Sequence, residues 1–255
     1  MSKCQVFNTE YGHQLAYHKT EGRGPTVIFL AGLMSDMEGT KALHLETWCR
    51  ENNQAFLRFD YSGHGQSSGR FEDGCIGDWQ RDTLAIVDAL TEGPIVPVGS
   101  SMGGWQALLL GRNRPKRMQG LVTIAAAPDF SEDSYWANFS EHEKTQLVLE
   151  GQVRVESDYA EPYIISERFI EDGRHHLVLR SPLVLSFPVR CLQGSADTAV
   201  EVHTALRLFH HASCHDFRLT LVKGADHRFS DEYCLKLIEE AVQDVSGTGS
   251  DDVSD

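Results

Sequence analysis

Short apolar runs alternate with helix-period segments along most of the 255-residue chain, and this alternation restricts the fold more than any other feature. Six runs have the length of a strand and are rich in Val, Ile and Phe: 26–32, 54–60, 94–100, 120–127, 187–194 and 217–224. Such runs are typical of parallel strands buried on both faces. Amphipathic segments at 40–52 and 76–90 separate the first three runs and are expected to form helices. This order predicts an α/β architecture with a mostly parallel, doubly wound sheet and helices on both faces.

The alternation changes at both ends and once inside the chain. Residues 3–8 and 13–19 flank a turn and predict an antiparallel hairpin that opens the sheet. The segment 129–187 is polar and aromatic, and it is too long for a plain loop. Because ligands bind beyond the carboxyl ends of parallel strands, where this insertion emerges, we expect a small cap there rather than a surface excursion. Residues 1–245 are expected to form one domain, followed by a disordered acidic tail at 246–255.

The stretch Gly99-Ser100-Ser101-Met102-Gly103 follows the third apolar run and precedes a helix-forming segment. A residue in a sharp strand-to-helix turn takes strained backbone angles and projects its side chain into a crevice. Glycines two positions away remove the Cβ atoms that would collide in so tight a turn. The pattern alone arises by chance in roughly one chain in ten, so its context has to decide. It predicts that Ser101 is a nucleophile.

Serine is a poor nucleophile at neutral pH and needs a histidine base, which a carboxylate usually orients. In a doubly wound sheet such side chains converge only on loops that follow the carboxyl ends of strands. Asp197 follows the apolar run at 187–194, and His227 follows the run at 217–224. The sequence therefore predicts a catalytic triad of Ser101, Asp197 and His227.

The acid and the base each have competitors. Asp197 could instead cap the helix that follows it, and Asp129, just after the fourth apolar run, is an alternative acid. Asp226 is adjacent to His227, and consecutive residues rarely point at each other. The other candidate histidines lie in or beside a predicted helix, where a solvated or half-buried histidine is the plainer interpretation: His203, His210, His211 and His215.

Hydrolysis of an acyl compound also requires hydrogen-bond donors for the oxyanion. Fixed backbone N–H groups serve well, and losing one donor costs about 2.7–4 kcal/mol of barrier. Met102 supplies one amide from the start of its helix, where the helix dipole favours negative charge. The second donor is expected in the loop after the run at 26–32, at Leu33.

Two residues near the predicted site have expected structural roles. His64 lies between Gly63 and Gly65 in a tight loop, and we expect it to be solvated or hydrogen-bonded locally rather than to act as a base. Trp105 lies in the helix that starts at Met102 and is expected to pack in the core.

Charge and cysteine content exclude several functions. The formal net charge is −14 with no basic run, which argues against binding to nucleic acid or an anionic membrane. No segment has the apolar length of a membrane span, and no apolar leader opens the chain. The six cysteines are scattered like reduced structural thiols, and the histidine clusters lack the spaced ligands of a metal site. We expect a soluble cytoplasmic protein with no cofactor or metal; the sequence leaves its oligomeric state open.

The chain resembles the serine α/β-hydrolases over nearly its whole length. Besides the elbow around Ser101, the resemblance rests on the stretches LAGLMSDMEGTKALHLETWC and LRFDYSGHGQSSG. The chain order Ser101, Asp197, His227 is also that of α/β-hydrolases. Within this superfamily the chain is similar to the small group that includes the mitochondrial palmitoyl-protein thioesterase and mycophenolic acid acyl-glucuronide esterase. The resemblance implies an α/β-hydrolase fold, with S-acyl thioesters and activated O-acyl esters, on small molecules or acylated proteins, as substrates.

We therefore expect an esterase or thioesterase that works through an acyl-Ser101 intermediate. Carbon–carbon hydrolases and acyltransferases use the same fold and triad and remain alternatives. A binding module without activity would be expected to have a broken triad, and here every member is present. Five aromatic residues of the cap are expected to wall an apolar acyl pocket: Trp136, Phe139, Tyr159, Tyr163 and Phe169.

Overall fold

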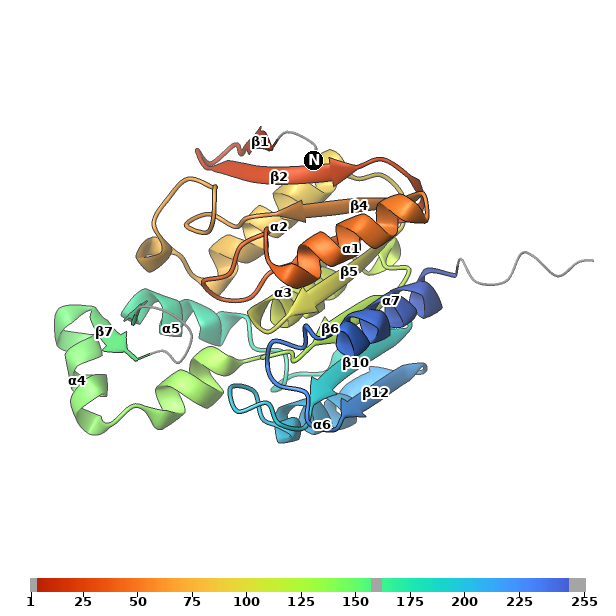
Figure 1. The fold of residues 1–255 in the computed structure, drawn as a ribbon. Coiled ribbons are helices and arrows are strands. Elements are labelled where there is room, and N and C mark those ends of the chain that lie inside the picture. Colours follow the sequence, from red (N-terminus) through yellow and green to blue (C-terminus); the bar gives the residue numbers. More distant parts are fainter. Residues whose placement is uncertain (1–3, 157–161, 248–255) are drawn as a thin grey trace, which may run out of the picture.

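The computed structural model describes residues 4–156 and 162–247. An eight-stranded sheet in the order β1-β2-β4-β3-β5-β6-β10-β12 forms its centre (Figure 1). These strands are β1 (Gln5–Asn8), β2 (Gln14–Thr20), β3 (Arg23–Leu30), β4 (Gln54–Phe59), β5 (Ile95–Ser100), β6 (Leu121–Ile124), β10 (Val189–Gly194) and β12 (Phe217–Val222). β2 pairs antiparallel with β1 and β4, and every other pairing is parallel. The predicted strands and the opening hairpin are confirmed.

Helices cover both faces of this sheet, as predicted. They are α1 (Thr40–Glu51), α2 (Ile76–Leu90), α3 (Met102–Asn113), α6 (Val202–His211) and α7 (Glu232–Ser246), with short 3₁₀ turns η1 (Phe71–Asp73) and η2 (Pro115–Arg117). α1 packs on α7 over one face, and α2 packs on α3 over the other (Figure 1). Right-handed crossovers place α6 on the face of α2 and α3, because all three connections advance in the same direction along the sheet.

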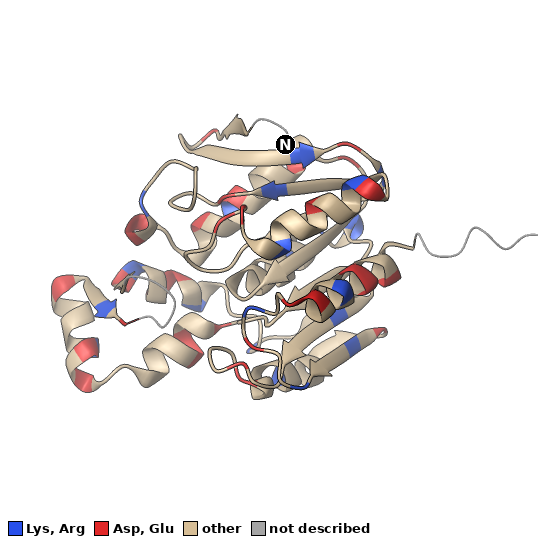
Figure 2. Ribbon diagram, in the orientation of Figure 1, with Lys and Arg blue, Asp and Glu red and all other residues tan. Residues whose placement is uncertain are grey.

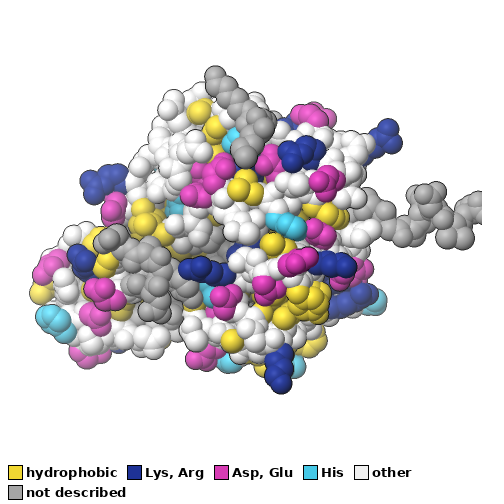
Figure 3. Space-filling view, in the orientation of Figure 1, with side chains coloured by type: hydrophobic (Ala, Val, Ile, Leu, Met, Phe, Trp, Pro, Cys, Tyr) yellow, Lys and Arg dark blue, Asp and Glu magenta, His cyan; other side chains and the backbone are white. Residues whose placement is uncertain are grey.

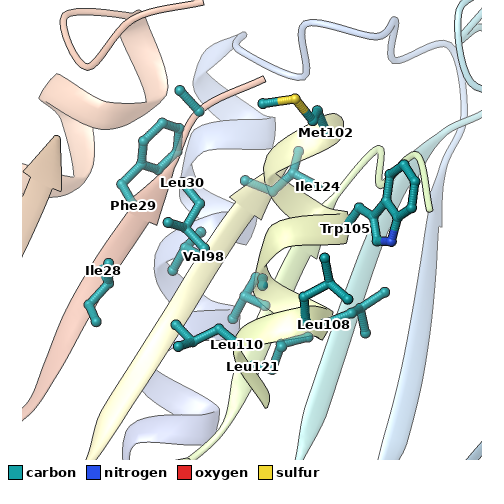
Figure 4. Close-up of a cluster of buried hydrophobic side chains, with 14 of the residues drawn as sticks. Ile28, Phe29, Leu30, Val98, Met102, Trp105, Leu108, Leu110, Leu121 and Ile124 are labelled. Carbon is teal, nitrogen blue, oxygen red and sulfur yellow. The ribbon is translucent and has the colours of Figure 1, made fainter. Parts of the chain in front are cut away.

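The hydrophobic core includes the side chains between α3 and the central strands. Figure 4 shows Ile28, Leu30 and Val98 of the strands beside α3, and none of these three side chains is exposed to solvent. Every residue of α3 from Met102 to Gly111 is buried. A helix that is covered all round belongs to the interior. The residue that precedes α3 is therefore followed by ten buried residues of this helix.

The insertion between β6 and β10 folds into its own small elements. They are the π-helical turn η3 (Ser131–Trp136), α4 (Glu141–Glu150), the antiparallel pair β7 (Gln152–Val155) and β8 (Tyr163–Ser166), and α5 (Glu167–His175). A capping box between Ser140 and Glu143 fixes the start of α4. Figure 1 shows α4 and β7 beyond the carboxyl ends of the parallel strands, whereas α5 lies against α2. We refer to residues 129–187 as the cap.

The sequence did not predict a second small sheet beside the large one. β9 (Leu183–Leu185) and β11 (Ala212–Cys214) pair in parallel outside the main sheet. α7 ends at Ser246, one residue into the segment predicted to be disordered, and residues 248–255 of that segment lie outside the described residues.

The surface carries charges of both signs. Figure 3 shows Lys and Arg side chains dispersed among Asp and Glu over one face of the molecule. In the described part of the chain, no helix has both the length and the hydrophobicity that crossing a membrane requires. All six cysteines have free thiols.

Candidate active site

Ser101 stands at the turn between β5 and α3. Its backbone angles, φ 55° and ψ −119°, lie outside the usual regions for a residue with a side chain. Three backbone hydrogen bonds hold this geometry. The Ser101 amide donates to the Ile124 carbonyl (2.9 Å), and the Ser101 carbonyl accepts from the amides of Gly104 (2.9 Å) and Ala127 (3.1 Å). The strain predicted from the Gly-x-Ser-x-Gly pattern is present and is supported by its neighbours.

The two glycines of the pattern are required by close backbone approach. A Cβ atom on Gly99 would overlap the backbone of Gly103, and one on Gly103 would overlap the Leu30 carbonyl. Both contacts are with backbone, which cannot move aside as a flexible side chain could. The turn therefore tolerates no side chain at either position.

The structure brings the three predicted triad residues together. His227 Nε2 lies 3.2 Å from Ser101 Oγ, and His227 Nδ1 lies 2.9 Å from Asp197 Oδ2. Asp197 lies beyond β10 and His227 beyond β12, so the residues meet at the carboxyl ends of three parallel strands. A hydroxyl, an imidazole and a carboxylate in this order can move a proton from the serine to the histidine.

Asp197 lies beside His227 and does not cap the next helix, since α6 begins at Val202 after Glu201. Its Oδ1 accepts from the amides of Ala199 (2.9 Å) and Val200 (2.8 Å), and its Oδ2 faces His227 and Gln193 Nε2 (3.0 Å). Burial alone would raise the pKa of Asp197. The hydrogen bonds from His227, Val200 and Gln193 outweigh burial and hold the pKa of this carboxyl below its ordinary value. It therefore stays ionised at neutral pH.

The competing carboxylates have other partners. Buried Asp129 accepts from the amides of Val178 (2.7 Å) and Leu179 (3.0 Å) and from Arg180 Nη1 (2.7 Å), so it ties the start of the cap to its end. Asp226 Oδ1 accepts from the amides of the two residues that follow His227, at 3.0 and 3.2 Å. Both carboxylates shape the chain around the site.

The predicted oxyanion donors border the serine. Met102 is the first residue of α3, where an amide has no partner within the helix. Leu33 follows Gly32, and a Cβ built on Gly32 would lie 3.3 Å from Ser101 Cβ. Backbone from the loop after β3 therefore lies directly against the nucleophile.

Asp60 shapes that loop, a role that sequence reasoning missed. Its buried carboxylate accepts from the amides of Met37 (2.7 Å) and Gln66 (2.8 Å) and so joins the loops after β3 and β4. Burial raises the pKa of Asp60 to about 6 despite these bonds. Its only sequence signal was its place at the end of an apolar run.

The two expected structural residues behave as predicted, with one refinement. Trp105 is fully buried, and its Nε1 donates to the His176 carbonyl (3.1 Å). His64 is hydrogen-bonded locally, with Nδ1 3.2 Å from the Ser62 carbonyl, but it is buried rather than solvated. Burial lowers the pKa of His64 to about 4, which keeps the ring neutral.

The cap aromatics build a packed cluster that continues from α3. Phe130 lies between Trp105 and Phe169, with ring centroids 5.7 and 5.8 Å away. Tyr135 contacts Phe130 at 5.5 Å and stacks on Phe139 at 6.1 Å. Phe139 and Phe169 are thus buried among other rings, where they join the cap to the core.

The remaining predicted pocket residues lie in other settings. Trp136 lies under the guanidinium of Arg174, 4.6 Å from the ring centroid, as a cation–π contact. Tyr163 is half-buried near Phe71 at 6.4 Å, and Tyr159 falls outside the described residues. In the described part of the chain, no cluster of His, Cys, Asp and Glu could hold a metal ion.

The fold and the site define a class of protein, and comparison agrees. The model of the family described as alpha/beta hydrolase fold matches residues 25–163, and the chain belongs to this family. The human palmitoyl-protein thioesterase ABHD10, named as mitochondrial, is 35% identical over 233 residues, which are 91% of this chain and 76% of that protein. These similarities support a hydrolase of esters or thioesters, as the sequence predicts. The cytoplasmic location stays a prediction.

Two solved structures resemble the whole chain. A putative hydrolase from Agrobacterium vitis S4 superposes with a TM-score of 0.91 at 34% identity, covering 96% of this chain and 98% of that one. Mouse alpha/beta hydrolase domain-containing protein 10 gives a TM-score of 0.90 at 32% identity, covering 98% and 100%. The similarity therefore includes the cap as well as the sheet.

Proposed function

We propose that this protein is a serine hydrolase that cleaves acyl thioesters and activated acyl esters through an acyl-Ser101 intermediate. The observation that carries the proposal is the continuous hydrogen-bonded chain from Ser101 Oγ through His227 to Asp197. His227 is the base, Asp197 orients it, and the amides of Leu33 and Met102 stabilise the oxyanion.

Acylation follows from the positions of these groups. Ser101 Oγ attacks the acyl carbon while its proton passes to His227 Nε2, 3.2 Å away. Asp197, ionised beneath the ring, stabilises the imidazolium that forms. The bond from the acyl carbon to sulfur or oxygen then breaks, and the leaving group takes the proton from His227.

Deacylation repeats these steps with water. Water gives a proton to His227 and attacks the acyl carbon, and Ser101 Oγ leaves and recovers that proton. The products are a carboxylic acid and a free serine, so no cofactor enters the balance. Thioesters and activated esters react ahead of amides, because an amide leaving group must be protonated before its bond breaks.

The substrate we propose carries a medium or long acyl chain, on a small molecule or a protein. Support comes from the relative named palmitoyl-protein thioesterase and from the aromatic cluster. That cluster begins at Trp105, four residues beyond the nucleophile, and extends through Phe130 into the cap. Most rings of the cluster are buried, and its half-buried members, Phe130 and Tyr135, are the ones that would contact an acyl chain.

A substrate screen tests this proposal. Purified protein is assayed with p-nitrophenyl esters, S-acyl-cysteine thioesters and acyl-CoA thioesters of increasing chain length, beside Ser101→Ala. We expect hydrolysis of esters and thioesters that depends on Ser101. Hydrolysis of neither class by a folded wild-type protein would contradict the proposal.

A further inference from the structure

Lys41 contacts the loop that carries His227. It lies near the start of α1, and its Nζ donates to the carbonyl oxygen of Arg228 at 2.5 Å. Arg228 directly follows His227 in the sequence. Lys41 and Arg228 are 187 residues apart in the sequence. The contact therefore joins a helix near the amino end of the chain to the residue next to the base.

The loop held by Lys41 is strained. Phe229 has φ 48°, a value that a bulky residue rarely adopts, and its side chain is fully buried. Such a conformation persists only where the surroundings fix it. Inside the loop, Asp226 accepts from the Arg228 and Phe229 amides, and Lys41 holds the outward carbonyl of Arg228.

α1 also begins where the oxyanion loop ends. The loop that carries Leu33 runs directly into the first turn of α1. A second side-chain contact of α1, from His44 Nε2 to Glu239 Oε1 at 2.6 Å, fixes this helix against α7. Lys41 thus ties the helix that follows the loop of Leu33 to the loop that carries the base.

We propose that Lys41 is a positioning residue for His227: its ammonium fixes the Arg228 carbonyl and so keeps the imidazole within reach of Ser101. This inference rests on the proposed function. In this role Lys41 acts through the backbone of Arg228, the residue next to the base.

The charge on Lys41 depends on pH within a measurable range. Burial is the largest influence and lowers the pKa of Lys41 to about 8. Asp226 and Cys234 oppose this change, and Arg228 adds to it. Above this pH the ammonium becomes a neutral amine, a weaker donor to a carbonyl. The contact is therefore strongest below pH 8 and weakens as the pH rises through that value.

Three variants separate positioning from simple support of the fold. Lys41→Met removes the charge and the donor, Lys41→Arg keeps a cation at all accessible pH values, and Lys236→Met is the control, an exposed lysine on α7. For each we measure kcat and KM for a p-nitrophenyl ester from pH 6 to 10, together with the melting temperature and the rate of fluorophosphonate labelling of Ser101.

We expect Lys41→Met to lower kcat about 10- to 100-fold with KM nearly unchanged, because a base displaced by a fraction of an ångström transfers protons poorly. Lys41→Arg should recover most of kcat and remove the loss of activity that the wild type develops above about pH 8. Lys236→Met should match the wild type in every measurement.

Two results would overturn the inference, and they differ from failure of the proposed function. One is wild-type kcat and labelling rate in Lys41→Met. The other is a pH profile that is the same in Lys41→Arg and the wild type, which would leave Lys41 a structural role only. An inactive wild type with no label on Ser101 would instead remove the proposed function, and the inference with it.

Discussion

The triad and the cap are held in place by different kinds of interaction. Backbone-to-backbone hydrogen bonds fix the turn of Ser101 and the loop before Asp197, such as Ser101 to Ile124 at 2.9 Å and Ala196 to Ala225 at 3.0 Å. The cap is held by packed aromatic rings and by ion pairs between side chains, both within the cap and to α6. Arg180 bonds Asp129 at 2.7 Å, and Asp133 also pairs with Arg207 of α6. Figure 2 shows acidic residues along α4, in the outer part of the cap.

This difference indicates that the triad region determines the reaction, whereas the cap determines which substrate is bound. Backbone bonds survive most side-chain substitutions, so the catalytic geometry depends on few side chains: those of the triad, and those of Asp226 and Lys41 that hold the loop of His227. Ion pairs between half-exposed side chains, such as that of Asp133 with Arg207, depend on residue identity, salt and pH, and each contributes little. The pair with buried Asp129 contributes more. The cap can therefore change its lining while the site beneath it keeps its geometry.

The largest effect should follow from truncating the triad. Ser101→Ala and His227→Ala should each lower kcat by about 10⁴-fold or more, since triad members act as one unit. The melting temperature should change little, because the turn is held by backbone bonds. Steady-state kinetics and thermal unfolding measure the two quantities. Loss of folding in Ser101→Ala would break the separation between geometry and chemistry.

Two buried aspartates give a matched test of the comparison. Asp197→Asn should lower kcat by about 10⁴-fold, because the amide favours the wrong tautomer of His227. Asp129→Asn should leave kcat far less affected but reduce the free energy of unfolding by about 3 kcal/mol, since Arg180 loses its buried partner. Kinetics and denaturant unfolding of both variants decide. A greater loss of kcat in Asp129→Asn would mean that Asp129 is the catalytic acid.

Protonation of buried Asp60 should change the free energy of unfolding with pH, and this effect should be smaller than those of the triad and Asp129 variants. Because burial raises its pKa to about 6, the folded protein binds a proton more tightly than the unfolded chain. The contribution of Asp60 to the free energy of unfolding should therefore rise as pH falls from about 7 to 4, by on the order of 2–3 kcal/mol. Asp60→Asn should lack this rise in denaturant unfolding. If the free energy of unfolding changed equally with pH in the wild type and in Asp60→Asn, the effect would not come from Asp60.

The smallest effect expected is the change in kcat/KM for each methylene added to the acyl chain. This series tests the role of the cap. Each methylene buried under the cap contributes up to about 0.8 kcal/mol, so kcat/KM should rise by up to about fourfold per methylene and then level off. Arg207→Met, which loosens the cap through Asp133, should reduce this rise while leaving acetyl esters unaffected. A flat series from acetyl to octanoyl would favour a small-acyl esterase or a carbon–carbon hydrolase.

The sheet and the triad could be predicted from sequence because their signals are local. Buried parallel strands need continuous apolar runs, and the loops after β5, β10 and β12 must meet at one edge. β9 and β11 are only three residues each, too short to give a recognisable apolar run. They form because the end of the cap lies beside the segment that follows α6. Local signals predicted Asp197 but left Asp129 as an alternative, because Asp129 also follows a strand. The contact of Lys41 with Arg228 depends on tertiary structure alone.

The same limit applies to the cap aromatics. Phe139 and Phe169 are apolar enough for a pocket wall or for a core, and sequence composition does not separate the two. Tertiary packing decides, because α5 lies against α2 and brings Phe169 within 5.9 Å of the Trp79 ring. The expected pocket lining is in part the interior of the cap.

Covalent trapping of the nucleophile tests the central claim most directly. Wild-type protein and Ser101→Ala are treated with a fluorophosphonate, and the adduct is located by intact-mass measurement and peptide mapping. We predict one adduct per chain on Ser101 and none in Ser101→Ala, because only a serine paired with a base is strongly nucleophilic. An equal adduct in Ser101→Ala, or no adduct on an active wild-type enzyme, would contradict the claim that Ser101 forms the acyl-enzyme.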